Sequence, residues 1–138
     1  GVVFVSLPSI GEGSSETFGV ALVAATAQGV CAVALGDIDG VPLCVTDAAT
    51  LPDGNLLFTA VAENTDNSFD DGPCSGSAIG IVDANGNLKA IERLDQPYKV
   101  EGVAATMHAD KINVLLVTDA DDASKAAWLL SAVLNKNE

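Results

Sequence analysis

The sequence predicts an all-β domain built from antiparallel strands, and three observations lead to that prediction. The apolar segments are short and rich in Val, Ala, Leu and Ile, which favours strands over long helices. Turn-forming sequences such as "PDGN" and "DANGN" separate them. The 138 residues are 49% hydrophobic and 18% charged, a composition that suits one globular domain, residues 1–138, with its own core.

Ten segments carry the apolar pattern of strands. They are residues 2–6, 18–26, 29–36, 44–51, 55–62, 77–83, 87–94, 100–106, 112–118 and 127–134. Asp53-Gly54 and Asn85-Gly86 accept positive φ at little cost, so the segments on either side of each pair are expected to form hairpins. Residues 8–16 and 64–77 are rich in Gly, Ser, Asp or Asn and are predicted to be loops.

The last segment supports two interpretations. Residues 121–136, "DDASKAAWLLSAVLNK", include the predicted strand at 127–134. The same residues also fit a helix with Asp122 or Ser124 as its N-cap, because Ala, Leu and Lys favour helices. Strand and helix therefore both remain open for this segment.

The charge of the chain excludes some partners. Nineteen acidic residues against six basic ones give a formal net charge of −13, so we expect no attraction to nucleic acid or to anionic membrane surfaces. No segment has the length and apolarity of a membrane span. Cys31, Cys44 and Cys74 are odd in number and lack metal-ligand spacing. These features favour a cytoplasmic location, with a processed secreted form as the alternative.

Acidic residues recur in a repeated order of acid, strand, turn, strand and acid. In residues 46–66, Asp47 precedes one predicted hairpin and Glu63 follows it. In residues 100–122, Glu101 takes the first position and Asp119 and Asp121 take the second. Since both termini of a tight hairpin lie at the same end, each set of carboxylates is expected to share one rim.

The spacing of this repeat predicts an architecture. Asp47 and Glu101 are 54 residues apart, which leaves room for four strands and lies in the range of repeat proteins. Four antiparallel strands form one blade of a β-propeller. A chain of 138 residues supplies two to three blades, so we expect a partial propeller. Either a homodimer closes the ring about a two-fold axis or the chain is part of a longer protein.

Carboxylates gathered at one rim repel one another unless a cation lies between them. Oxygen ligands favour Ca²⁺ or Mg²⁺, and Ca²⁺ tolerates an irregular set of oxygens. The predicted metal ligands are Asp47, Glu63, Glu101 and Asp119, and Ca²⁺ is the expected cofactor. Asp122, in contrast, is expected to cap a turn or to lie solvated at the end of a strand.

Four stretches carry a family resemblance: "TDAATLPDGNLLFTAVAE", "DGPCSGSAIGIVDANG", "KVEGVAA" and "LLVTDADD". Across residues 37–134 the chain resembles the carboxy-terminal half of an uncharacterised bacterial β-propeller family, distantly similar to phytase-like and gluconolactonase-like propellers. The resemblance implies acidic residues at a channel mouth that hold Ca²⁺ and help to hydrolyse phosphate esters or lactones. Only Lys99 lies near the acids in sequence, which disfavours phosphate esters.

Two functions follow, and they leave open whether the chain is an enzyme. The first is a metal-dependent hydrolase of small esters or lactones, in which the metal polarises the substrate and activates water. The alternative is a noncatalytic propeller that binds a small molecule or a protein partner. His108 falls in a predicted turn far from the acids, and Ser75 and Ser77 have no nearby histidine. A hydrolase triad is therefore not expected, and the catalytic residues are unknown.

Overall fold

The computed structural model describes residues 20–26, 29–64 and 72–136, all of them in strands, turns or loops. The strands are β1 (Val20–Thr26), β2 (Gly29–Ala34), β3 (Asp37–Ile38), β4 (Val41–Thr50), β5 (Leu56–Glu63), β6 (Cys74–Val82), β7 (Leu88–Arg93), β8 (Val100–His108), β9 (Lys111–Thr118) and β10 (Leu129–Asn135). No helix that could cross a membrane occurs in these ranges. The strand predicted at 2–6 and the loop predicted at 8–16 lie outside the described residues.

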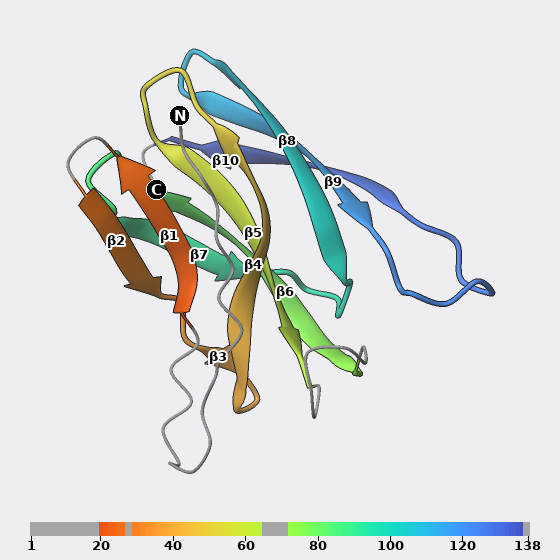
Figure 1. The fold of residues 1–138 in the computed structure, drawn as a ribbon. Coiled ribbons are helices and arrows are strands. Elements are labelled where there is room, and N and C mark those ends of the chain that lie inside the picture. Colours follow the sequence, from red (N-terminus) through yellow and green to blue (C-terminus); the bar gives the residue numbers. More distant parts are fainter. Residues whose placement is uncertain (1–19, 27–28, 65–71, 137–138) are drawn as a thin grey trace, which may run out of the picture.

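The strands form three antiparallel sheets that lie next to one another (Figure 1). β1 and β2 form a two-stranded ribbon. The central sheet has the order β3-β4-β5-β6-β7, and the third sheet has the order β10-β9-β8. The prediction of an all-β antiparallel fold is confirmed, and the structure adds the two-residue strand β3, which the sequence analysis did not include.

The helix interpretation of the C-terminal segment is wrong. Residues 129–135 form β10, which pairs with β9 from Leu129↔Val117 to Asn135↔Lys111. Residues 119–128 form a loop before it. Helix propensity is a weak preference that tertiary pairing overrides, and here β9 offers an apolar strand edge to which β10 binds.

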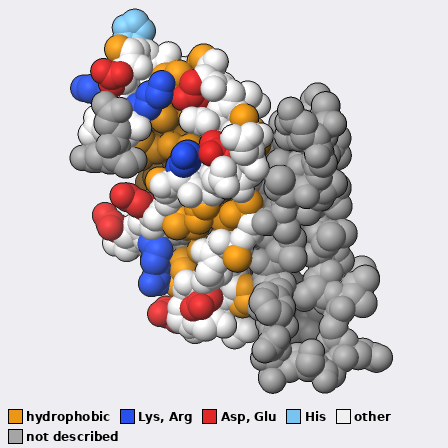
Figure 2. Space-filling view, turned by 90° about the vertical axis from the view of Figure 1, so that its left-hand side faces the viewer, with side chains coloured by type: hydrophobic (Ala, Val, Ile, Leu, Met, Phe, Trp, Pro, Cys, Tyr) orange, Lys and Arg blue, Asp and Glu red, His pale blue; other side chains and the backbone are white. Residues whose placement is uncertain are grey.

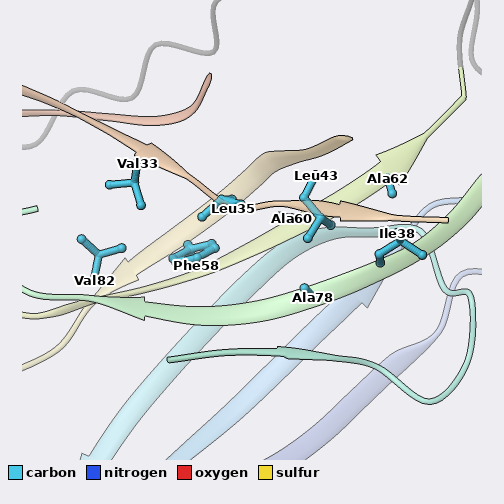
Figure 3. Close-up of a cluster of buried hydrophobic side chains, with 9 residues drawn as sticks. All are labelled: Val33, Leu35, Ile38, Leu43, Phe58, Ala60, Ala62, Ala78 and Val82. Atoms are coloured by element: carbon cyan, nitrogen blue, oxygen red, sulfur yellow. The ribbon is translucent and has the colours of Figure 1, made fainter. Parts of the chain in front are cut away.

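The central sheet is buried on both faces, so two cores hold the described residues together. One face packs against Val33 of β2 and Leu35, with Phe58 and Val82 among the contributors. Figure 3 shows this cluster, with Val33, Leu35 and Val82 near the Phe58 ring and Ile38 at the other end. The opposite face packs against the third sheet through a second cluster: Leu51, Leu57, Ile79, Val100, Ile112, Val114 and Leu116. Strand β5 is therefore apolar almost throughout, as expected for a strand covered on both sides.

Close packing explains one glycine in β6. A Cβ atom on Gly80 would lie 2.3 Å from Cζ of Phe58. That distance is far inside van der Waals contact, so the Phe58 ring occupies the space that any larger residue would need. The hairpin between β4 and β5 turns at Gly54, whose φ of 86° suits glycine.

The β5–β6 pair of the central sheet and the β9–β10 pair of the third sheet share one register, whereas β4–β5 and β8–β9 do not. Thr59 of β5 pairs with Ile79 of β6, and 54 residues later Asn113 of β9 pairs with Val133 of β10. Ala60↔Ala78 and Val114↔Ala132 are related by the same shift. The spacing read from the acidic residues thus recurs as a spacing between strand pairs. The central sheet carries β7 on the outer side of β6, and β10 has no counterpart of β7 among the described residues.

Candidate functional site

Three residues that are far apart in the sequence meet where strands of the central sheet and the third sheet end or begin. Glu63 is the last residue of β5, Lys99 precedes β8, and Asp121 lies in the loop after β9. Because β5 and β8 contact each other across the sheet interface, their ends bring these side chains together. We call Glu63, Lys99, Glu101 and Asp121 the Lys99 cluster.

The Lys99 ammonium pairs with all three carboxylates of this cluster. Its Nζ lies 3.0 Å from Glu63 Oε1 and 3.9 Å from Glu101 Oε1, and it also donates a hydrogen bond to Asp121 Oδ2. The Lys99 side chain is only 11% exposed. Buried ammonium groups need such partners, because transfer of an unpaired charge from water is costly.

The cluster changes the pKa values of Lys99 and Glu101. Burial acts to lower the pKa of Lys99, but Asp121 and Glu63 outweigh it and raise that pKa. Lys99 is therefore a fixed cation and is unsuited to act as a base or nucleophile at neutral pH. Burial also raises the pKa of Glu101, and Lys99 opposes that shift only in part.

Hydrogen bonds fix the main chain on both sides of Lys99. The buried Ser77 hydroxyl donates to the Tyr98 carbonyl and accepts from the Val100 N–H at 3.3 Å. The Asp119 N–H donates to the Lys99 carbonyl at 3.0 Å. Ser77 thus positions Lys99 rather than serving as a nucleophile.

The loop after β9 brings an aromatic side chain to the same place. Trp128 is tied to Thr118 by two hydrogen bonds, from its N–H to the Thr118 hydroxyl and from the Thr118 N–H to its carbonyl. Its side chain nevertheless remains exposed. Asp121 adopts a φ of 51°, and its N–H donates to Asp119 Oδ1. Asp is one of the residues that tolerate this left-handed conformation, which helps to place the Asp121 carboxylate near Lys99.

These residues surround a pocket of about 740 Å³. Its charged lining consists of Glu63, Asp121 and Asp122 together with Lys99 and Lys125, and its aromatic lining is Tyr98 and Trp128. Lys125 pairs with Asp122 at 3.6 Å. Asp122 also accepts hydrogen bonds from the Ser124 N–H and hydroxyl, so it caps a turn, as the sequence analysis expected. The charges of both lysines are thus matched within the lining, and an excess of carboxylate remains.

Asp47 lies elsewhere, which corrects the expected rim geometry. β4 begins at Val41, so Asp47 stands within the strand, opposite Thr59, and not at the outer end of the hairpin. Its Oδ1 accepts from the Ala48 N–H at 2.8 Å, and its Oδ2 accepts from the Val103 N–H at 2.9 Å. The expected strand began too late because the short β3 pairing at Val41 is not visible in the apolar pattern.

The other predicted ligands lie at or near the cluster. Glu63 and Glu101 belong to it, and Asp119 acts on the pKa of Glu101 and is bonded to the Asp121 N–H. No group of three or more His, Cys, Asp or Glu side chains arranged as a metal site occurs within residues 33–64 and 72–136. The role of these acids in metal binding stays a prediction.

The described thiols offer no activated nucleophile beside the pocket. Cys44 and Cys74 are free. Burial is the main cause that raises the pKa of both thiols, and Glu63 adds to it. Both therefore remain protonated at neutral pH, whereas reactive cysteines have a lowered pKa. His108 is exposed at the far end of β8, next to the turn into β9.

The contributions of Lys99, Ser77 and Trp128 to the site are not predicted from the sequence pattern. Lys99 was noted only as a nearby base, Ser77 only as an unsupported nucleophile, and Trp128 was placed within an element and not in a loop. A usable signal was present for Lys99. It is a rare basic residue directly before an apolar strand in a strongly acidic chain, and such a position suggests a buried counter-charge.

Comparison with known proteins gives a family without an assigned activity. Residues 10–123 match the profile of a family described as "Family of unknown function (DUF6910)". No curated protein and no solved structure matches the chain. The similarity to phytase-like and gluconolactonase-like propellers therefore remains an expectation from sequence motifs. Since the profile spans most of the chain, the protein belongs to this family of unknown function, DUF6910.

Proposed function

We propose that this protein is a noncatalytic binding module whose pocket takes a small organic cation, such as a polyamine. The observation that carries this proposal is the composition of the pocket lining. Carboxylates outnumber ammonium groups there, and an exposed Trp128 ring stands beside them. Carboxylates attract a cation, and the face of a Trp ring attracts it as well, by about 0.5–1 kcal/mol at an exposed site.

The protonation and hydrogen bonding of the polar groups favour binding over catalysis. Lys99 is locked as a cation, the two described thiols are protonated, and Ser77 is buried and engaged by the main chain. Glu101 is the one group at the cluster whose raised pKa suits proton transfer. A lone carboxyl group without a nucleophile beside it is a weak basis for hydrolysis.

The fold supports a binding role in a second way. We propose that the central sheet and the third sheet are successive blades of a partial propeller, since the β5–β6 and β9–β10 pairs share one register and the two sheets pack face to face. The pocket then lies between the ends of adjacent blades. Loops at such ends are common places for ligand sites.

Calorimetry tests the proposal. Titration with spermidine should release or absorb heat in a saturable manner, whereas the neutral 1,8-octanediol should give none. Added NaCl should weaken the binding, because the attraction between exposed charges is screened. Asp121→Asn should weaken it as well. The matched control is Asp110→Asn, which makes the same charge change in the β8–β9 turn, at the other end of β8.

Two results would contradict a site for organic cations. The first is absence of heat with spermidine at millimolar concentration. The second is equal weakening by Asp121→Asn and Asp110→Asn, since this would indicate attraction to the overall charge of −13 and not to the pocket.

Ca²⁺ is a second candidate, favoured by one specific observation. Glu63 Oε1 is buried and lies 3.0 Å from the Lys99 ammonium, which the Glu101 carboxylate also approaches. A cation bound by Glu63, Glu101 and Asp119 would share the first two carboxylates with Lys99. Ca²⁺ should then raise the melting temperature by mass action. If NaCl at the same ionic strength raises the melting temperature equally, the effect is charge screening, and Ca²⁺ is no longer a candidate.

A further inference from the structure

The repeat with the central sheet would place a further strand on the outer edge of β10, and the described residues supply none there. In the central sheet, β7 pairs with β6 through Ala78↔Arg93, Ile79↔Glu92 and Gly80↔Ile91. β10 occupies the position of β6 in the repeat, with Ala132 and Val133 in place of Ala78 and Ile79. No described strand pairs with β10 on that side. Among the described residues, the outward N–H and C=O groups of its main chain therefore have no strand partner.

The sequence of β10 offers no charged side chain that would protect its edge. Although the protein carries 19 acidic residues, residues 126–135 contain no charged side chain. Edge strands that stay unpaired are normally protected by charges, proline or a bulge. β10 has none of these within its bounds, and its Leu129 and Val133 side chains are 72% and 58% exposed. An edge of this kind is suited to accept another strand.

A cavity marks the place where that strand would lie. It measures about 180 Å³ and is lined by Ile79, Ile81, Ala90 and Glu92 on one side and by Leu134 and its neighbours on the other. These residues belong to β6, β7 and β10. Figure 2 views the side on which β7 and the C-terminal end lie in Figure 1, and shows hydrophobic side chains at the surface in a band among charged groups.

We propose that the edge of β10 binds an extended segment of another polypeptide, which adds as a fourth strand antiparallel to β10. Because β10 corresponds to β6, the pairing of β7 with β6 predicts that this segment lies opposite Ala132 to Asn135. The cavity sets its chemistry. An apolar side chain faces Ile81 and Ala90, and a Lys or Arg two residues further along lies on the same face near Glu92. Main-chain hydrogen bonds supply affinity, and the alternate side chains supply specificity.

The probe is a labelled peptide with the sequence of β7 and its neighbours, residues 87–94, "NLKAIERL". This segment fills the equivalent position on β6. Its binding to the whole chain is measured by fluorescence anisotropy. The control peptide has proline in place of the isoleucine, which removes one N–H and breaks the extended pairing. Because the substitution is in the peptide, the fold of the protein is not affected.

We expect saturable binding of the first peptide and at least about tenfold weaker binding of the proline peptide, as lost ladder hydrogen bonds imply. Hydrogen exchange should slow in residues 129–135 when the first peptide is bound. Equal binding of both peptides, absence of binding, or protection confined to other strands would overturn the proposal. Sedimentation of the chain alone supplies a further test. A stable dimer with residues 129–135 already protected would show that a second copy occupies this edge, and would also overturn it.

Discussion

At the scale of single residues, Lys99 determines the character of the site. Its ammonium group is nearly buried and pairs with Glu63, Glu101 and Asp121. Each partner is more exposed than the lysine itself, and Asp121 is the most exposed of them at 40%. The cluster therefore joins a buried positive charge to three carboxylates, of which those of Glu63 and Asp121 line the pocket. Removal of the lysine would leave those carboxylates without their counter-charge.

Lys99→Met should lower the free energy of unfolding by about 2–4 kcal/mol, because the methionine keeps the length of the side chain but leaves partly buried carboxylates unpaired. Urea unfolding followed by circular dichroism measures this change. Lys89→Met is the matched control. Lys89 pairs with Asp83 at 3.5 Å, but its side chain is 58% exposed, so its loss should cost less than about 1 kcal/mol. Similar losses for the two variants would contradict the importance of Lys99.

Glu101 should make stability depend on pH in a defined direction. Burial raises the folded-state pKa of its carboxyl group above the unfolded value. The folded state therefore binds the proton more tightly, and stability decreases as the pH rises through this raised pKa. Glu101→Gln should be more stable than the native chain at pH 7 by less than about 1 kcal/mol, since the Glu101 side chain is 38% exposed.

This difference should disappear below the unfolded pKa of the glutamate, near pH 4, where both states are protonated. Urea unfolding at pH 3.5, 5 and 7 measures it. A difference that stays constant over this range, or a less stable variant at pH 7, would show that the ion pair with Lys99 outweighs burial.

At the scale of elements, Asp47 joins two strands that belong to different sheets. Its carboxylate accepts the Val103 N–H of β8, and the neighbouring Thr46 hydroxyl donates to the Val100 carbonyl at 2.7 Å. Thr46 is the extra residue of a β-bulge in β4, opposite Ala60 and Thr59. Bulges redirect side chains, and this one turns Thr46 and Asp47 toward β8.

Asp47→Ala should lower the free energy of unfolding by about 1–3 kcal/mol, because the Val103 and Ala48 N–H groups lose their acceptor in a partly buried position. The amide of Val103 should then exchange with solvent faster than the other amides in the middle of β8. Nuclear magnetic resonance of the labelled chain measures this exchange. Unchanged protection of Val103 in the variant would contradict a role for Asp47 in joining β4 to β8.

At the scale of the whole molecule, the sequence predicts the individual strands better than it predicts how they assemble into sheets and how the sheets pack. The "PDGN" turn and the apolar runs beside it locate the β4–β5 hairpin, because its strands and turn are close in sequence. The Lys99 cluster, in contrast, cannot be predicted from neighbouring residues in the sequence. Asp121 lies 22 residues from Lys99, and only the packing of one sheet against another brings both to Glu63. Apolar periodicity contains no information on that packing.

The same distinction explains why the predicted acidic rim contains Glu63 and Glu101 but not Asp47. The sequence order correctly placed Glu63 and Glu101 near one another, since both stand at strand ends in the same part of the fold. It misplaced Asp47, because the extent of β4 depends on β3 and on a bulge. Neither β3 nor the bulge can be recognised from the pattern of apolar residues.

The fluorescence of Trp128 tests the proposed pocket most directly. It is the only tryptophan of the chain, its side chain is exposed and it lines the pocket, so its emission reports on this site alone. Spermidine should change the intensity and shift the emission to shorter wavelength in a saturable manner, because a bound cation displaces water from the ring. The change should be retained in Asp110→Asn and reduced in Asp121→Asn. An emission spectrum that is unchanged by spermidine, or that responds equally to 1,8-octanediol, would contradict an organic-cation site.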